Sequence, residues 1–374
     1  MKYISTFFAA LSIAVSGCYA NDVGEPEDRN LQGLAASLDF VITPLEAEGA
    51  SGVVFVTNGD QEAYARAFGF ADCANKIPMT LNHVISIGSI TKELVNVAAF
   101  GLVDESVIFW DDAVSKWIAD WPAEKAITIR QLSTHTSGLP DIVDENGAPI
   151  PFTPEYDFAP VTREEMIDRA RASKLLFEPG TQERYSNLGF ALYAAILENA
   201  VGQPIEGILR KRIFEPAGMM QTGYVVPDWT MSNFAEGCRA DRSRWGSPLP
   251  DGRWMEDGPG WNLRGNGGLY STARDMARYM GGLGAKKFLS DAADQSWRDK
   301  RLVFVKSANA RGFGPAGGNG ITNTVIFWLE EDADGNDLRV VIMTTDASHQ
   351  AESFASDIIR SAFDVFRPIE EPAP

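Results

Sequence analysis

The sequence predicts a mixed α/β (α+β) fold: an antiparallel sheet built from both ends of the chain, flanked by terminal helices and interrupted by a large, mostly helical insertion. Two hairpin signals support the sheet, because Asn58-Gly59 and Asp334-Gly335 each separate two β-rich runs. Between them, residues 86–300 carry mainly helical apolar spacing broken by Pro and Gly loops. The economical arrangement is therefore one sheet with an inserted helical region.

Helices are predicted at both ends of this fold. Before Gly49, apolar residues recur at helical spacing: Leu34, Leu38 and Val41. Residues 352–366 form an amphipathic pattern whose apolar side is built from Phe354, Ile358, Ile359, Ala362 and Phe363. Neither an internal repeat nor a linker divides the chain, so one domain is expected over residues 32–365, followed by a tail over 366–374.

Residues 1–20 have the build of an export signal. One basic residue, Lys2, precedes an apolar run that is too short to span a bilayer with ease. The run ends in "VSGC", which resembles a bacterial lipobox, so cleavage before Cys18 would leave this cysteine to be lipidated. The alternative is plain secretory cleavage after Ala20. Residues 21–31 are acidic and are interpreted as a tether.

Both alternatives predict an exported protein. Tyr19 and Ala20, rather than Asp, follow Cys18, and the sorting rule of bacterial lipoproteins then implies a periplasmic protein anchored to the outer membrane. Plain cleavage implies a secreted one. Cys73 and Cys238 would lie in an oxidising compartment, where they either pair or remain two separate thiols.

Composition excludes several classes of partner. The formal net charge of −18 argues against nucleic acid and against adhesion to anionic lipid, so a small molecule or polymer is the expected partner. Three histidines, without an H-E-x-x-H motif or paired cysteines, give no metal site. No cofactor is implied.

Ser89 and Lys92 form an S-x-x-K motif at the expected start of a helix. Residues three apart on a helix are neighbours, so an amine would lie beside a hydroxyl there. A helix N-terminus also favours the negative charge of an attacking alkoxide. The alternative is a serine cap with a solvated lysine. The core-facing residues of this helix are Ile90, Leu94, Val97, Ala98 and Leu102.

Tyr185 and Asn187 precede a second apolar helix pattern. A phenol is a poor base at neutral pH, because its ordinary pKa is near 10. A neighbouring ammonium, such as that of Lys92, would favour the phenolate, which could then take the Ser89 proton. The alternative is an aromatic side chain packed at a helix start.

His135, within "ITIRQLSTHTSGLPD", invites a Ser–His–Asp interpretation. However, the chain has no G-x-S-x-G elbow, which removes the commonest α/β-hydrolase route. We therefore interpret His135 as a structural loop histidine with local hydrogen bonds.

Five stretches, in this order, resemble the β-lactamase-related serine hydrolases, which include class C β-lactamases, D-alanyl-D-alanine carboxypeptidases and related esterases. They are S-I-T-K at 89–92, "ITIRQLSTHTSGLPD", "FEPGTQERYSNLG", "RIFEPAGM" at 212–219 and "GNGGLYSTARDMARYM" at 265–280. The resemblance covers roughly residues 32 to 365. It implies that Ser89 is the acylated nucleophile, Lys92 its activating partner, Tyr185 the proton-handling residue and Asn187 a substrate-positioning residue.

The chain departs from the family's pattern at the third motif. Where the family has K-T-G or H-x-G on a strand, this chain has "GFGPAGGNG", with Pro315 or Ala316 at the place of the cation. The resemblance still implies a backbone N–H in the oxyanion hole, from Gly318 or, with a one-residue shift, from Asn319. The missing cation weakens the case for penicillins and for other substrates with a carboxylate beside the scissile bond.

Two arginines are possible substitutes for this cation, Arg264 and Arg311, although ordinary surface roles are the alternative for both. The loops at 140–160 and 225–262 would shape the substrate pocket. They carry no readable pattern, and the Trp- and Arg-rich stretch that begins at Cys238 either lines the entrance or anchors the loop by packing.

The sequence therefore predicts an exported serine hydrolase that forms an acyl-enzyme with a small ester or amide, or with a peptidoglycan-derived substrate. Esterase, D-alanyl peptidase and weak β-lactamase activity remain open. The alternative is a non-catalytic relative that binds cell-wall peptide or a partner protein in the same cleft.

Overall fold

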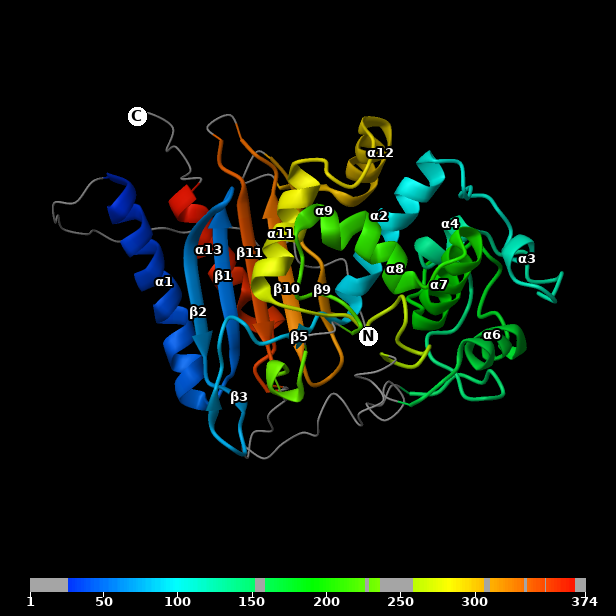
Figure 1. The fold of residues 1–374 in the computed structure, drawn as a ribbon, viewed down its shortest axis with the longest axis horizontal. Coiled ribbons are helices and arrows are strands. Elements are labelled where there is room, and N and C mark those ends of the chain that lie inside the picture. The colour runs from blue at the N-terminus through cyan, green and yellow to red at the C-terminus, as the bar shows by residue number, and fades with distance from the viewer. Residues whose placement is uncertain are drawn as a thin grey trace.

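The computed structural model describes residues 26–151, 159–225, 229–235, 258–305, 310–332, 335–346 and 348–366 (Figure 1). The expected export signal with Cys18, as well as Cys238 and Asp334, lies outside the described residues. Cys73 is disulfide-bonded, so the prediction of an unrelated thiol is wrong for this residue. No helix in the described part of the chain has the length and apolar character to cross a membrane.

A seven-stranded antiparallel sheet joins the two ends of the chain, as the sequence predicts. Its strand order is β2-β1-β11-β10-β8-β7, and β9 also pairs with β10. The strands are β1 (Gly52–Asn58), β2 (Gln61–Phe68), β7 (Val303–Val305), β8 (Ala310–Phe313), β9 (Ala316–Gly318), β10 (Asn323–Leu329) and β11 (Leu338–Thr344). Each predicted hairpin, β1–β2 and β10–β11, forms, and β1 and β11 lie side by side.

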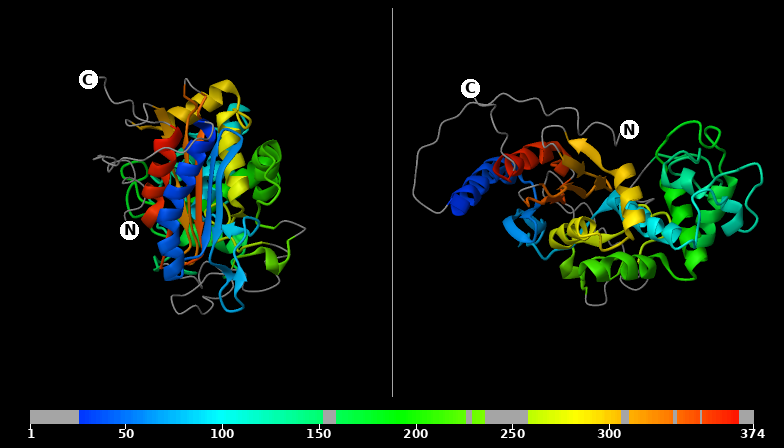
Figure 2. Two further views of the ribbon diagram at one scale, coloured as in Figure 1. Left: turned by 90° about the vertical axis from the view of Figure 1, so that its left-hand side faces the viewer. Right: turned by 90° about the horizontal axis from the view of Figure 1, so that it is seen from above.

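Helices cover both faces of this sheet (Figure 2). The terminal helices α1 (Pro26–Glu48) and α13 (Ala351–Phe366) pack together on one face, where alternate strand residues such as Val54 and Ile342 meet them. The intervening residues, such as Val53 and Met343, face the other core. There they pack with α11 (Ala273–Gly284) and the helical insertion.

The helix α1 begins earlier than the sequence analysis expects. It starts at Pro26, inside the predicted acidic tether over 21–31, so residues 26–31 are helical. Proline is well suited to the first turn of a helix. The face that α1 buries is set by Leu34, Leu38 and Ile42, whereas Val41 is only partly buried.

The helical insertion separates the two sets of strands in the sequence, and most of it lies beside the sheet, at the right in Figure 1. Its helices are α2 (Thr91–Asp104), α3 (Val114–Trp117), α4 (Ile129–Ser133), α6 (Arg163–Ala172), α7 (Asn187–Val201), α8 (Ile205–Leu209), η2 (Arg210–Phe214), α9 (Glu215–Ala217), η3 (Met231–Asn233) and α12 (Asp291–Arg301). Two short ribbons accompany them: β3 (Phe70–Asp72) with β4 (Ile77–Pro78), and β5 (Ile85–Ser86) with β6 (Tyr270–Ser271). The second ribbon brings the 265–271 segment against the approach to Ser89.

Candidate active site

Ser89 lies in a single 3₁₀ turn, η1 (Gly88–Ile90), that leads directly into α2. It does not cap the helix, because neither η1 nor α2 has a side-chain cap hydrogen bond at its start. The capping alternative is therefore wrong. All five predicted core residues of this segment are buried, which leaves Ser89 on a different side, with its side chain partly accessible.

Lys92 is 3% exposed, so the alternative of a solvated lysine is also wrong. Its Nζ donates to Ser89 Oγ at 3.1 Å, to Asn187 Oδ1 at 2.8 Å and to the carbonyl oxygen of Asn266 at 2.5 Å. An ammonium group has three donors, and these acceptors come from three distant segments of the chain. Lys92 thus holds the nucleophile and its surroundings in one geometry.

Tyr185 completes the immediate surroundings of Ser89. Its Oη lies 2.5 Å from Ser89 Oγ, and either oxygen can be the donor. Lys92 Nζ lies 4.7 Å from the centre of the Tyr185 ring, close enough for an attractive cation–π interaction. A positive charge at this place also favours the phenolate over the phenol.

Asn187 is the first residue of α7, and the sequence around it explains its position. The hydroxyl of Ser186 caps this helix by accepting the N–H of Gly189 at 2.8 Å. The N–H of Asn187 donates to Asp141 Oδ1, also at 2.8 Å. Burial raises the pKa of Asp141, while this N–H and the charge of Lys92 act in the opposite direction. Sequence reasoning did not single out Asp141, although it closes the quoted motif "STHTSGLPD".

His135 supports Tyr185 from behind. Its ring centre lies 4.5 Å from that of Tyr185, and its Nδ1 accepts the N–H of Ser186 at 3.2 Å. Burial, followed by the charges of Lys92 and Arg301, lowers the pKa of His135 to about 3. The ring is therefore neutral at physiological pH. Its bond reaches 51 residues along the chain, so it is structural, as interpreted from sequence, but not local.

Asn266 is the second residue that sequence reasoning missed. Besides accepting the Lys92 ammonium on its carbonyl oxygen, it donates from Nδ2 to the carbonyl oxygens of Asn262, at 2.7 Å, and of Asn187, at 3.3 Å. Its side chain is 2% exposed. The only signal for it in the sequence is its place in the stretch "GNGGLYSTARDM".

The strand β9 lies against the turn that carries Ser89, and its pairing with β10 indicates which N–H groups point out of the sheet. The N–H of Asn319 donates to the carbonyl oxygen of Thr322 at 3.2 Å, at the turn between β9 and β10. Alternate residues of an antiparallel strand point their N–H groups in opposite directions. The N–H of Gly318 therefore points away from β10, and Gly318 is exposed.

Glycine is required where β9 touches the turn that carries Ser89. A Cβ on Gly317 would lie 2.3 Å from the carbonyl oxygen of Ile87 and 2.6 Å from the nitrogen of Ser89. A Cβ on Gly88, whose φ is +49°, would lie 2.5 Å from the nitrogen of Gly318. A glycine at 317 and another at 88 are thus what allow β9 to lie against the turn that carries Ser89.

Both arginines considered as substitute cations have other contacts. Arg311 forms an ion pair with Glu330 at 2.6 Å. Arg264 donates from Nε to the carbonyl oxygen of Pro259 at 2.9 Å and lies over the rings of Tyr224 and Trp261. In the part of the chain that the structure describes, no group of His, Cys, Asp and Glu side chains could hold a metal ion.

This arrangement has the parts that acyl transfer requires. A hydroxyl lies within hydrogen-bond distance of a phenol oxygen and an ammonium nitrogen, beside a strand with an outward-pointing N–H. The family model described as "Beta-lactamase" matches residues 38–361. The chain belongs to the β-lactamase family. The fold class and the resemblance predicted from sequence are both confirmed.

Two curated relatives of the chain are a penicillin-binding protein and an esterase. It is 27% identical over 255 residues to penicillin-binding protein 4* of Bacillus subtilis, covering 66% of this chain and 55% of the relative. The chain thus spans little more than half the length of that protein. It is 29% identical over 322 residues to esterase EstB of Burkholderia gladioli, covering 78% of this chain and 80% of the relative.

A solved structure confirms the fold. The D-amino acid amidase of Ochrobactrum anthropi superposes with a TM-score of 0.70 at 21% identity, covering 92% of this β-lactamase-family chain and all of that one. At this level of identity the match establishes the architecture alone.

The neutral state of His135 makes the stability of the protein pH-dependent. Its pKa is about 3 in the folded protein and near 6.5 when unperturbed, so between these values the unfolded chain binds more protons. Stability is full above pH 6.5 and is lost as the pH falls toward 3. We expect urea denaturation of His135→Gln to show a pH slope lower than wild type by about 1 kcal/mol per pH unit.

Burial raises the pKa of Asp141, which makes its contribution to stability fall as the pH rises. Because Asp141 is present in both wild type and His135→Gln, this contribution cancels when their pH slopes are compared. Parallel stability curves for the two proteins between pH 4 and 6 would contradict a buried neutral His135.

Proposed function

We propose that this protein is a serine hydrolase that cleaves an ester or amide through an acyl-enzyme on Ser89. The observation that carries the proposal is that Ser89 Oγ lies at hydrogen-bond distance from both Tyr185 Oη and Lys92 Nζ. A nucleophile with an adjacent base, itself oriented by a third group, is the usual arrangement for covalent catalysis.

In the acylation step, Tyr185 is proposed to start as the phenolate: Ser89 Oγ attacks the carbonyl carbon of the substrate while its proton passes to the Tyr185 oxygen, which becomes a neutral phenol. The Lys92 ammonium stabilises the negative charge that moves between these two oxygens. The backbone N–H groups of Ser89 and Gly318 are proposed as donors to the oxyanion. When the bond to the leaving group breaks, Tyr185 returns the proton to the departing oxygen or nitrogen.

In the deacylation step, a water molecule attacks the acyl carbon. Its proton passes to the Tyr185 oxygen and from there to Ser89 Oγ, which regenerates the free hydroxyl. Asn187 is proposed to orient the acyl group, because its side chain is fixed by Lys92 and its backbone by Asp141. The complete reaction consumes only the substrate and one water molecule.

Esters and simple amides are the proposed substrates, in preference to penicillins. Penicillins carry a carboxylate near the scissile bond, and this chain has an uncharged residue, Pro315 or Ala316, where the family is expected to have its cation. Loss of a charged contact costs about 1.5–3 kcal/mol of binding where nothing replaces it. The similarity to esterase EstB supports the same choice. D-alanyl peptidase activity would require another partner for the terminal carboxylate of the peptide.

A substrate panel tests the proposed function. We expect wild type to hydrolyse small activated esters faster than penicillin, and Ser89→Ala to lose at least about 10³-fold of the ester turnover, since the covalent route is removed. Turnover that is unchanged in Ser89→Ala would rule out the mechanism. Thr91→Ser serves as a control for altering a neighbouring hydroxyl residue on the same helix.

We also propose that the protein is exported and anchored by a lipid on Cys18, on the strength of the apolar run and the "VSGC" sequence. Labelling of cells with a radioactive fatty acid should mark the wild-type protein and not Cys18→Ser. An unlabelled wild-type protein whose N-terminus is Asn21 would instead indicate plain cleavage and secretion.

A further inference from the structure

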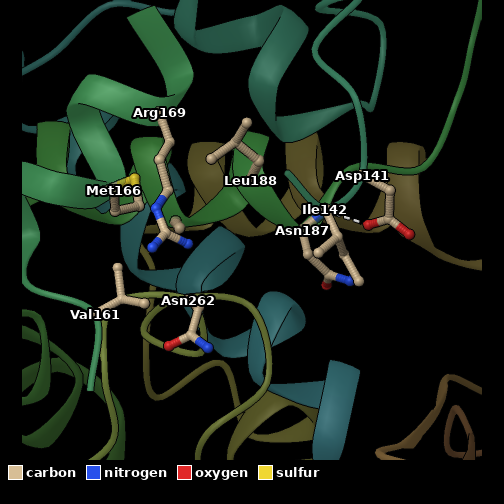
Figure 3. A pocket seen from close by; sticks show the side chains of 9 residues that line it. Asp141, Ile142, Val161, Met166, Arg169, Asn187, Leu188 and Asn262 are labelled. Carbon is tan, nitrogen blue, oxygen red and sulfur yellow. Dashed lines mark hydrogen bonds between the residues drawn. The ribbon is translucent and has the colours of Figure 1, made fainter. Parts of the chain in front are cut away.

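Asn266 connects two of the segments that surround Lys92. It is 2% exposed, and its Nδ2 donates to two backbone carbonyl oxygens, that of Asn262 at 2.7 Å and that of Asn187 at 3.3 Å. Asn187 begins α7, whereas Asn262 lies in the loop that leads to Asn266, and both border one small recess (Figure 3). A side-chain amide has two N–H donors, so Asn266 uses both of them to hold its own loop and α7 together.

Lys92, Asn187 and Asn266 form a closed triangle of hydrogen bonds. Lys92 Nζ donates to Asn187 Oδ1 at 2.8 Å and to the carbonyl oxygen of Asn266 at 2.5 Å. The third side of the triangle is the bond from Asn266 Nδ2 to the carbonyl oxygen of Asn187. Because this side does not involve the ammonium, it fixes the spacing between two acceptors of Lys92 independently of Lys92 itself.

The loop that carries Asn266 is rich in glycine. Gly265, Gly267 and Gly268 flank Asn266, and the φ of Gly265 is +81°. Glycine leaves the backbone many alternative conformations. The N–H groups of Gly267 and Gly268 both donate to the carbonyl oxygen of Leu263, at 3.1 and 3.0 Å, so these bonds stay within the loop. The Asn266 side chain adds a bond from the loop to α7, next to the carbonyl group that Lys92 contacts.

We propose that Asn266 is a positioning residue for the nucleophile, whose side-chain amide keeps the acceptors of Lys92 at the spacing that directs the ammonium to Ser89. The inference rests on the proposed function, because it takes Lys92 as the cation that assists proton transfer from Ser89. Asn266 acts through Lys92 and Asn187 and is not itself a catalytic residue. Without its amide, the loop carbonyl and the start of α7 can separate, and the ammonium loses its fixed direction.

The test replaces Asn266 by leucine, which has a similar shape and no N–H donor. The readout is the rate at which a fluorophosphonate modifies Ser89 of the full chain, followed by intact mass. We expect Asn266→Leu to reach one adduct per chain but to react about tenfold more slowly than wild type, which corresponds to the loss of one hydrogen bond.

A double-mutant cycle with Lys92→Met separates positioning from a general structural effect. If Asn266 acts through Lys92, then adding Asn266→Leu to Lys92→Met should leave the labelling rate at the value of Lys92→Met alone. A structural role would instead slow labelling by the same factor in both backgrounds.

Asn199→Leu is the matched control. Asn199 Nδ2 donates to the carbonyl oxygen of Trp117 at 2.7 Å, so an amide of the same kind ties the other end of α7 to a distant segment. Its loss should leave the labelling rate unchanged. Thermal melts of all variants show that the proteins compared are folded.

A wild-type labelling rate in Asn266→Leu, or an equal slowing with and without Lys92, would overturn the inference and leave the proposed function intact. Asn266→Ala, in which water can reach the two carbonyl oxygens, replaces Asn266→Leu if the leucine variant does not fold. Failure of both variants to fold would make Asn266 a structural residue and would also overturn the inference. A wild-type protein that the reagent does not modify at Ser89 would contradict the proposed function.

Discussion

The buried ammonium of Lys92 is the interaction on which the site depends. It donates to Ser89, Asn187 and Asn266, so it joins the 3₁₀ turn before α2, the start of α7 and the loop before β6. Lys92 is 3% exposed, and burial of a charged group destabilises a fold unless the group is paired or hydrogen-bonded. The three segments that supply its acceptors therefore depend on one another for their stability around Lys92. The hydrogen bonds that position Ser89 and Asn187 are therefore also contacts that stabilise the folded insertion.

Backbone proximity is the second constraint on the site. Gly88 and Gly317 let β9 and the Ser89 turn touch at distances that exclude any Cβ. This contact places the outward N–H of Gly318 beside the turn that carries Ser89. Neither Pro315, just before β9, nor Ala316, its first residue, carries a charge, so β9 contributes backbone contacts here.

Much of this was predictable from sequence, because hairpin dipeptides and apolar periodicity fix the sheet and the terminal helices. The motif order predicts Ser89, Lys92, Tyr185 and Asn187, which the structure brings together. Asp141 and Asn266 were not predictable, because spacing does not reveal that Asp141 accepts a backbone N–H or that Asn266 accepts on its loop carbonyl.

The central claim is that Ser89 is an activated nucleophile rather than part of a binding cleft. Intact-mass analysis after exposure to a fluorophosphonate tests it most directly, because this reagent phosphonylates an activated serine without requiring the natural substrate. We expect one adduct per chain, mapped to the peptide that contains Ser89, and slower labelling of Lys92→Met and Tyr185→Phe. A wild-type protein that remains unmodified, or an adduct that persists in Ser89→Ala, would contradict this account and favour a non-catalytic, peptide-binding relative.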